Sequence, residues 1–132
     1  MQIMDVILPK TDSPSATEVN VHMIMDNMFH KVFTPNYKKS FLQSFAKLNL
    51  YLTSKQFHTA SPKEQTELLL QLENAKDAAQ GFKAYIDIKQ QSIAYYLSNE
   101  EIAENYLNYL PIPDGYTARI SVAEVGGKAW AE

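Results

Sequence analysis

The chain has 132 residues, of which 45% are hydrophobic and 20% are charged, and its formal net charge is −3. This length predicts a single domain, residues 1–132, with one buried core. Lysines and acids are interspersed without a basic patch, so the charge pattern does not indicate a nucleic-acid partner. The sequence contains no cysteine, which excludes disulfides, thiolate catalysis and cysteine metal sites.

The sequence shows neither a membrane span nor a signal segment. No stretch approaches the ~20 consecutive apolar residues of a membrane-spanning helix, and no charged-then-apolar leader pattern is present. The chain opens inside an apolar pattern, which predicts the last turns of a helix that Pro9 ends. A removed leader and a short protein would both give this beginning. A polar loop over residues 11–15 is predicted next.

Two amphipathic helices follow this loop in the predicted order. Apolar side chains recur at helical spacing on one face of the first helix: Val21, Met25, Met28, Phe29 and Val32. Thr34 and Pro35 predict the start of the second helix, with threonine as N-cap and proline at the first helical position. The apolar stripe of this second helix is also regular: Tyr37, Phe41, Phe45, Leu48 and Leu52.

The next helix start is marked by a capping box at residues 61–64, Ser-Pro-Lys-Glu. Its buried side is predicted to carry leucines: Leu68, Leu69 and Leu72. Gly81 separates this helix from the next one, which runs from Phe82 to Leu97. Because residues 82–97 are apolar on more than one face, we expect this helix to be central.

The last part of the chain is predicted to contain one short helix and an arm. Ser98 with Glu101 predicts a capping box that opens a helix ending near Leu107. Prolines then enforce extended backbone, and the alternation over residues 116–122 leaves a short strand possible, with coil the favoured state. The fold class is therefore all-α: a small bundle of about five helices with a long irregular C-terminal arm, approximately residues 108–132.

One metal-like constellation is present in the first long helix. His22, Asp26 and His30 are spaced four residues apart, so one helix face presents all three, and imidazole and carboxylate at this spacing occur in zinc sites. The alternative is a helix whose wet face happens to carry two histidines and an aspartate. Because the motif lacks a fourth ligand, we expect no metal site. No serine lies in a nucleophile elbow, and no phosphate loop or dinucleotide fingerprint is present, so we also expect no catalytic and no cofactor-binding residue in this chain.

The aromatic residues near the C-terminus indicate a contact surface. Aromatic side chains with a polar end are enriched at interfaces, and the arm region carries four: Tyr106, Tyr109, Tyr116 and Trp130. We predict that they form an interface. The alternative is that they attach the arm to its own bundle.

Two blocks of the sequence resemble the small subunit, subunit 3, of the gluconate 2-dehydrogenase family. The first is residues 5–14, Asp-Val-Ile-Leu-Pro-Lys-Thr-Asp-Ser-Pro. The second is residues 95–116 together with the Gly-Gly-Lys-Ala-Trp ending at 126–130. Ser15 stands where the family usually has glycine, and Leu97 where threonine is usual.

The resemblance implies an accessory role. Such subunits associate with a large FAD-bearing subunit of the glucose-methanol-choline oxidoreductase type, often together with a haem-bearing cytochrome c. The large subunit oxidises a sugar or sugar acid, and the small subunit carries neither flavin nor haem but supports folding, export and assembly of its partner. By the same resemblance we expect the periplasm, or the periplasmic face of the inner membrane, as the location. Without its partner, the small subunit is expected to self-associate through exposed apolar patches.

Two other functions remain open from the residues alone. One is a free-standing helical metal protein that uses His22, Asp26 and His30. The other is a helical interaction module unrelated to dehydrogenases, which would bind its partner through the flexible methionines of residues 23–28.

Overall fold

The computed structural model describes residues 2–108 and 119–130, and these ranges contain six α-helices, one 3₁₀ turn and no strand. The α-helices are α1 (Gln2–Ile7), α2 (Val21–Lys31), α3 (Pro35–Ser54), α4 (Pro62–Ala75), α5 (Phe82–Leu97) and α6 (Glu100–Tyr106). The 3₁₀ turn η1 (Ala78–Gln80) lies between α4 and α5. The predicted all-α fold class is confirmed.

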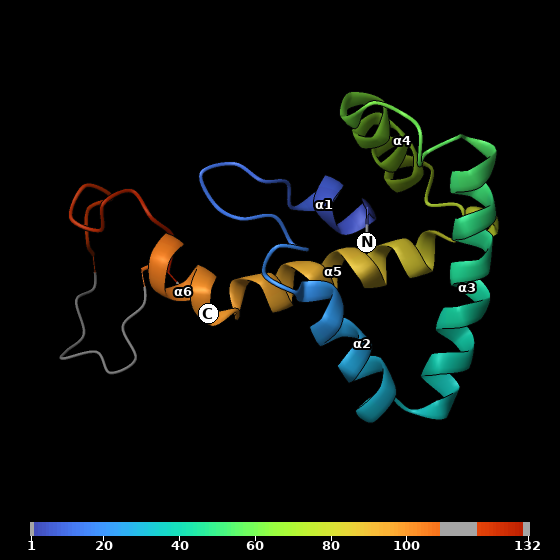
Figure 1. Cartoon of the computed structure of the whole chain (residues 1–132), viewed down its shortest axis with the longest axis horizontal. Helices are drawn as coiled ribbons and strands as arrows, with labels where there is room; N and C mark the ends of the chain where they lie inside the picture. Colours follow the sequence, from blue (N-terminus) through green and yellow to red (C-terminus); the bar gives the residue numbers. More distant parts are fainter. Residues whose placement is uncertain (1, 109–118, 131–132) are drawn as a thin grey trace.

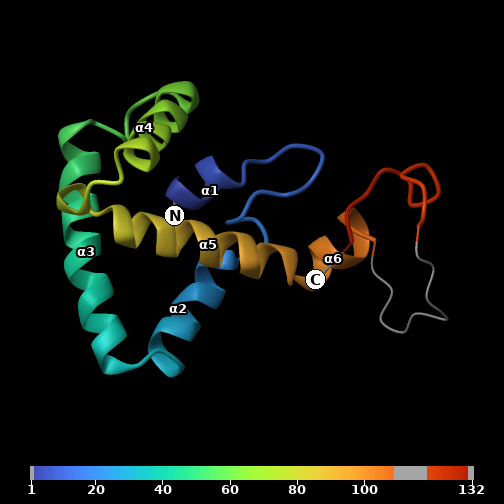
Figure 2. The same cartoon turned by 180° about the vertical axis from the view of Figure 1, so that it is seen from behind.

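Helix α5 is the central element, as the sequence predicted. It contacts each of the other five α-helices, and Figures 1 and 2 show it running through the middle of the molecule. α3 crosses one end of α5, and α2 approaches α5 nearer its other end, so that α2, α3 and α5 form the sides of a triangle (Figure 1). α6 and the described arm residues 119–130 lie beyond the end of α5, away from α3.

One hydrophobic core joins the helices around α5. Its largest fully buried apolar side chains are Phe57, Leu48, Leu72, Ile102 and Val21. The predicted burial of Leu48, Leu52, Leu69 and Leu72 is confirmed. Phe45, which belongs to the same predicted stripe, remains partly exposed, because the space beside it is a cleft rather than packed core.

Local capping chemistry fixes two helix starts where the sequence placed them. The Thr34 side chain accepts a hydrogen bond from the backbone N–H of Tyr37 (3.3 Å). At α4, Ser61 Oγ accepts from the Glu64 N–H (3.4 Å), and Glu64 Oε2 accepts from the Ser61 N–H (2.8 Å). Each cap satisfies backbone donors that the first helical turn leaves unpaired.

The predicted capping box at the start of α6 is wrong by one residue. The N-cap is Asn99, whose side-chain oxygen accepts from the N–H groups of Glu101 (3.0 Å) and Ile102 (3.4 Å). Ser98 instead ends α5, where its hydroxyl donates to the carbonyl of Ala94 (2.9 Å). Both residue types favour N-caps, so the sequence pattern alone could not separate them.

Replacing Asn99 by alanine should therefore destabilise the protein, whereas Ser98→Ala should change little. Asn99→Ala removes the cap and a second bond, from Asn99 Nδ2 to the carbonyl of Val19 (3.2 Å). We expect a loss of about 1–2 kcal/mol in the free energy of unfolding, measured by urea denaturation. Ser98→Ala should stay within about 0.5 kcal/mol of the wild type. A larger loss of stability for Ser98→Ala than for Asn99→Ala would show that Ser98 is the N-cap.

The start of α5 is built against the backbone of α3. Gly81 adopts a left-handed conformation (φ 78°) and has no side chain with which to cap the helix. The Ser44 hydroxyl from α3 accepts a hydrogen bond from the Ala84 N–H (3.0 Å) instead. The two helices are therefore joined at their crossing by a cap that comes from another element.

A long loop, residues 8–20, connects α1 with α2 and is held in place by side-chain hydrogen bonds at its middle and in its second half. The carboxylate of Asp5 accepts from the Thr17 backbone N–H (3.0 Å) and from the Thr17 hydroxyl (2.8 Å). The Tyr96 hydroxyl on α5 contacts Ser13 Oγ (2.9 Å) and the Pro14 carbonyl (2.7 Å). These bonds hold the N-terminal segment on the C-terminal half of α5.

The described part of the arm folds back on the end of α6. The Asn108 backbone N–H donates to the Ala129 carbonyl (2.7 Å). Its side-chain amide donates to the carbonyls of Val125 (3.0 Å) and Lys128 (2.7 Å). Residues 119–122 form no strand, and the rest of the possible strand, residues 116–118, lies outside the described ranges.

Within residues 2–108 and 119–130, no helix combines the length and apolarity that crossing a bilayer requires.

Candidate interaction surface

A cleft opens inside the triangle of α2, α3 and α5, with α1 at one end. Its volume is about 350 Å³, and its lining is predominantly apolar. Buried core residues form its floor: Met4, Leu48, Leu52 and Ile88. Cavities of this size with a mainly hydrophobic and aromatic lining are the usual form of a binding site.

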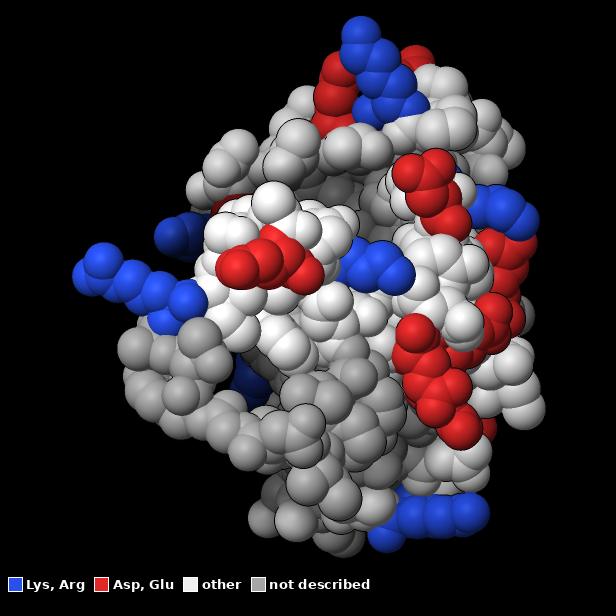
Figure 3. Space-filling model, turned by 90° about the vertical axis from the view of Figure 1, so that its left-hand side faces the viewer, with Lys and Arg blue, Asp and Glu red and all other residues white. Residues whose placement is uncertain are grey.

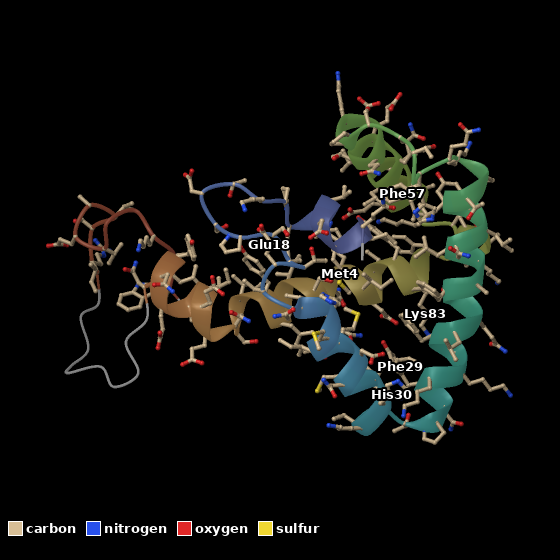
Figure 4. The ribbon with its side chains drawn as sticks, in the orientation of Figure 1. Met4, Glu18, Phe29, His30, Phe57 and Lys83 are labelled. Carbon is tan, nitrogen blue, oxygen red and sulfur yellow. The ribbon has the colours of Figure 1, made fainter. Side chains whose placement is uncertain are left out.

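The walls of the cleft carry a ladder of aromatic rings. Its members, the aromatic ladder, are Phe29, Phe33, Tyr37, Phe41 and Phe45. Consecutive ring centroids are close: Phe29–Phe33 6.4 Å, Phe33–Tyr37 4.7 Å, Tyr37–Phe41 6.1 Å and Phe41–Phe45 5.8 Å. Phe29 also contacts Phe41 across the cleft, at 5.5 Å between centroids, and Figure 4 shows Phe29 between α2 and α3. Such pairs add about 0.5–1.5 kcal/mol each beyond area burial, so the ladder holds α2 and α3 in a fixed relation.

Polar side chains from α5 fix the position of the middle ring. The Tyr37 hydroxyl donates to Asp87 Oδ2 (3.2 Å) and accepts from Gln91 Nε2 (2.9 Å). Burial raises the pKa of Tyr37, and the negative charge of Asp87 adds to this effect. Two buried polar atoms of the lining, Gln91 Oε1 and His22 Nδ1, have no hydrogen-bond partner among the described residues.

The mouth of the cleft exposes large apolar side chains. Leu42 is 53% exposed and Phe45 is 40% exposed, and both line the cleft. Lys38 is not among the lining residues, but its Nζ lies 5.8 Å from the centre of the Phe29 ring and donates a hydrogen bond to the His30 carbonyl (2.8 Å). Among the described residues, the one acidic side chain in the lining is Asp26.

The two helices that form the cleft differ in charge from the rest of the molecule. Residues 21–54 contain four lysines and a single acid, Asp26, whereas the remaining residues contain eight basic and fourteen acidic side chains. The α2–α3 region thus has a net charge of +3 and the remainder −6. Figure 3 faces the opposite end of the molecule, beyond α6, where acidic side chains gather along one side.

The structure does not assemble the metal constellation suggested by the helical spacing. Asp26 Oδ1 and His30 Nε2 lie 3.5 Å apart on the solvent-facing side of α2, with side-chain exposures of 75% and 71%. His22 is half-buried and lines the cleft. No group of three or more histidine, aspartate or glutamate side chains within residues 2–108 and 119–130 is placed to hold a metal ion.

The four predicted interface aromatics have different environments. Tyr106 is half-buried and packs against the core of its own chain. Trp130 is 50% exposed, and its backbone is held beside Asn108. Tyr109 and Tyr116 lie outside the described residues. Their role as an interface stays a prediction.

The sequence did contain a signal for the aromatic ladder. Its members recur at every fourth residue from 29 to 45, which is the spacing of one helix face. The predicted stripes contain Phe29 on the first helix and Tyr37, Phe41 and Phe45 on the second, whereas Phe33, just before Pro35, belongs to neither. The contribution of Gln91 and Asp87 has no comparable signal, since both come from a helix more than forty residues further along the chain.

The two blocks that carry the family resemblance meet in space. Residues 5–14 belong to α1 and the loop after it, and the block that starts at residue 95 begins on α5. The bonds from Tyr96 to Ser13 and Pro14 join these blocks directly, across 83 and 82 residues of sequence. The blocks are therefore parts of one structural unit.

Comparison with known proteins gives one match. The family model described as gluconate 2-dehydrogenase subunit 3 matches residues 1–115. No curated protein and no solved structure matches the chain. The matched range contains the cleft, the aromatic ladder and both ends of the contact between Ser13 and Tyr96, and it covers most of the chain. The chain therefore belongs to the gluconate 2-dehydrogenase subunit 3 family.

Proposed function

We propose that this chain is the non-catalytic small subunit of a flavin-dependent dehydrogenase complex that oxidises a sugar or sugar acid. Its task is to support folding, export or assembly of the large FAD-bearing subunit. The observation that carries the proposal is the family match over residues 1–115, because the family is named as a subunit of gluconate 2-dehydrogenase.

The surface of the molecule supports a role in binding another protein. Large apolar side chains stand exposed beside an aromatic cleft, as Leu42 and Phe45 do. Contiguous exposed apolar surface of this kind marks protein contacts in soluble domains. Trp130 provides a further exposed aromatic side chain on the arm.

Within this proposal, the redox groups belong to partner subunits. FAD resides in a large subunit of the glucose-methanol-choline oxidoreductase type, and haem resides in a cytochrome c subunit where one is present. The complex operates in the periplasm or at the periplasmic face of the inner membrane. Alone, the small subunit self-associates through its exposed apolar side chains.

Co-expression with a large FAD-bearing subunit of the glucose-methanol-choline oxidoreductase type tests the proposal. A tag on this chain should retain the flavoprotein, and the retained complex should show the visible absorbance of oxidised flavin. The flavoprotein expressed alone should yield less soluble, flavin-loaded protein. Equal yields with and without this chain, together with no retention on the tag, would overturn the proposal.

The same experiment examines the predicted arm interface. A chain that ends at Leu110 lacks the segment with Tyr116 and Trp130. We expect this truncated chain to retain less flavoprotein than the full chain, since an extended arm adds contact area to an interface that typically buries ~800 Å² per partner. Equal retention by both chains would remove the arm from the interface while leaving the function intact.

A further inference from the structure

We propose that the cleft between α2 and α3 binds an amphipathic helix of the flavoprotein subunit, one whose apolar face is flanked by aspartate or glutamate. This inference rests on the proposed function and adds to it the contact surface and the chemistry of the bound segment. It places a principal contact at the opposite end of the molecule from the arm (Figure 1).

The walls of the cleft determine the kind of segment that can bind there. Both walls are helices, α2 and α3, whose backbone groups bond within the helix, so they offer no free edge for an added strand. Recognition must then proceed through side chains, and the corresponding mode is an amphipathic helix whose anchors recur at i, i+3 or i+4 and i+7. A space of about 350 Å³ receives such anchors rather than a whole backbone.

The exposed fractions of the lining indicate a surface prepared for contact. Leu42 and Phe45 line the same cleft and are 53% and 40% exposed. Exposure of such large apolar side chains to water does not stabilise the isolated domain. Covering them would extend the core outward from Leu48 and Leu52, which are already buried beneath. The partner's side chains would complete this core.

Charge determines what flanks the partner's apolar face. The α2–α3 region is net positive in a chain that is net negative, with four lysines against one acid, Asp26, which itself lines the cleft. One of these lysines, Lys38, contacts the ring of Phe29, which is part of the lining. Charges across an interface are arranged to be complementary, so a bound helix with an acidic flank would fit the net positive charge of this region.

Two other occupants fit the geometry less well. A bilayer would need an apolar surface that projects outward, whereas the ladder rings line a concave space. A second copy could bring its acidic end to the basic helices, but such a head-to-tail contact does not close and would lead to filaments. The range of the family match, residues 1–115, contains the whole cleft and leaves out Trp130. A cleft within the matched range is what we expect if members of the family bind their flavoprotein subunits through it.

Substitutions at the mouth of the cleft test the proposal. In the purified complex, Leu42→Glu and Phe45→Glu should each raise the Kd for the flavoprotein at least tenfold, because a carboxylate would be buried without a partner. Leu50→Glu is the matched control: Leu50 is on the same helix, is 71% exposed and lies outside the cleft. It should change the Kd less than twofold. Circular dichroism of each variant confirms that the fold is retained.

Photo-cross-linking identifies which residues of this chain lie against the flavoprotein. A photoreactive amino acid at position 42 should form a bond with a flavoprotein helix that carries acidic residues, and the same group at position 50 should not. Raising the ionic strength should weaken the wild-type complex several-fold, and Lys38→Gln should reduce this dependence.

The outcomes separate the two proposals. If the wild-type chain binds the flavoprotein and Leu42→Glu and Phe45→Glu bind it equally well, the cleft is not the contact and the proposed function stands. If the wild-type chain binds no flavoprotein, both proposals fail. Loss of self-association or of binding to anionic vesicles in the cleft variants, without loss of flavoprotein binding, would also overturn the cleft proposal, in favour of a second copy or a membrane.

Discussion

Gly81→Ala should lower the free energy of unfolding by roughly 2–5 kcal/mol, which is a large fraction of the total stability of an ordinary domain. The reason is that two costs coincide at one residue. Gly81 has a φ of 78°, a conformation that side chains with a Cβ adopt only with strain. The added methyl group would also collide with α3.

The collision involves backbone and cannot be relieved by a change of rotamer. A Cβ on Gly81 would lie 2.3 Å from the Leu48 nitrogen, 2.6 Å from the Ser44 carbonyl oxygen and 2.7 Å from the Leu48 Cα. Relief requires α3 and α5 to separate. That separation would also break the bond between Ser44 and the Ala84 N–H and open the base of the cleft.

Gly126→Ala supplies a matched control. Gly126 is also left-handed (φ 63°), but a Cβ there would meet nothing within 4 Å. It should cost only the conformational strain, about 1 kcal/mol, and should act locally on the arm. Urea midpoints measured for both variants check the argument. Similar midpoints would mean that the close approach of α3 to Gly81 does not contribute to stability.

Phe57→Ala should destabilise the protein by about 3–5 kcal/mol, the usual cost of emptying a buried aromatic site. Phe57 is fully buried (0% exposed) although it lies in the connection between α3 and α4, and Figure 4 places it where these helices meet. Both of its backbone polar groups are hydrogen-bonded: its N–H donates to the Leu52 carbonyl (3.0 Å), and its carbonyl accepts from Gln65 Nε2 (2.8 Å). Little relaxation is available to fill the cavity.

Thermal and urea unfolding of Phe57→Ala, compared with Leu50→Ala, measures this cost. Leu50 is largely exposed, so its truncation should change stability by less than about 0.5 kcal/mol. A Phe57→Ala protein as stable as the Leu50→Ala protein would contradict the buried position of this ring.

Phe57 also shows where sequence patterns lose their predictive power. It lies outside any helical period, so no spacing rule assigns it to the core, whereas Leu48 and Leu52 on the adjacent helix follow the rule and are buried. The start of α4 at Ser61 was equally predictable, because the capping box is formed by residues within four positions of one another. Helical spacing and capping boxes involve residues that are close in sequence, so they predict local structure but not the burial of a residue such as Phe57 in a connection between helices.

The cleft is the part of the site that the sequence could not give as a whole. The aromatic residues were visible at every fourth position, but their union into one ladder depends on the angle at which α2 and α3 meet after Val32. The hydrogen bonds that hold Tyr37 come from α5, and their existence depends on the crossing of α3 and α5 at Gly81. The roles of Tyr109 and Tyr116 stay predictions, since neither lies in the described ranges.

The fastening of the N-terminal loop on α5 has a consequence for the order of folding. The bond between Tyr96 and Ser13 closes a span of 83 residues, whereas the contacts between α2 and α3 and within α4 are local. Bringing distant segments together costs more entropy than closing short loops, by about 0.6 kcal/mol for each doubling of the span. The segment that contains Ser13 and Pro14 can therefore make its native contacts only after α5 has been synthesised as far as Tyr96.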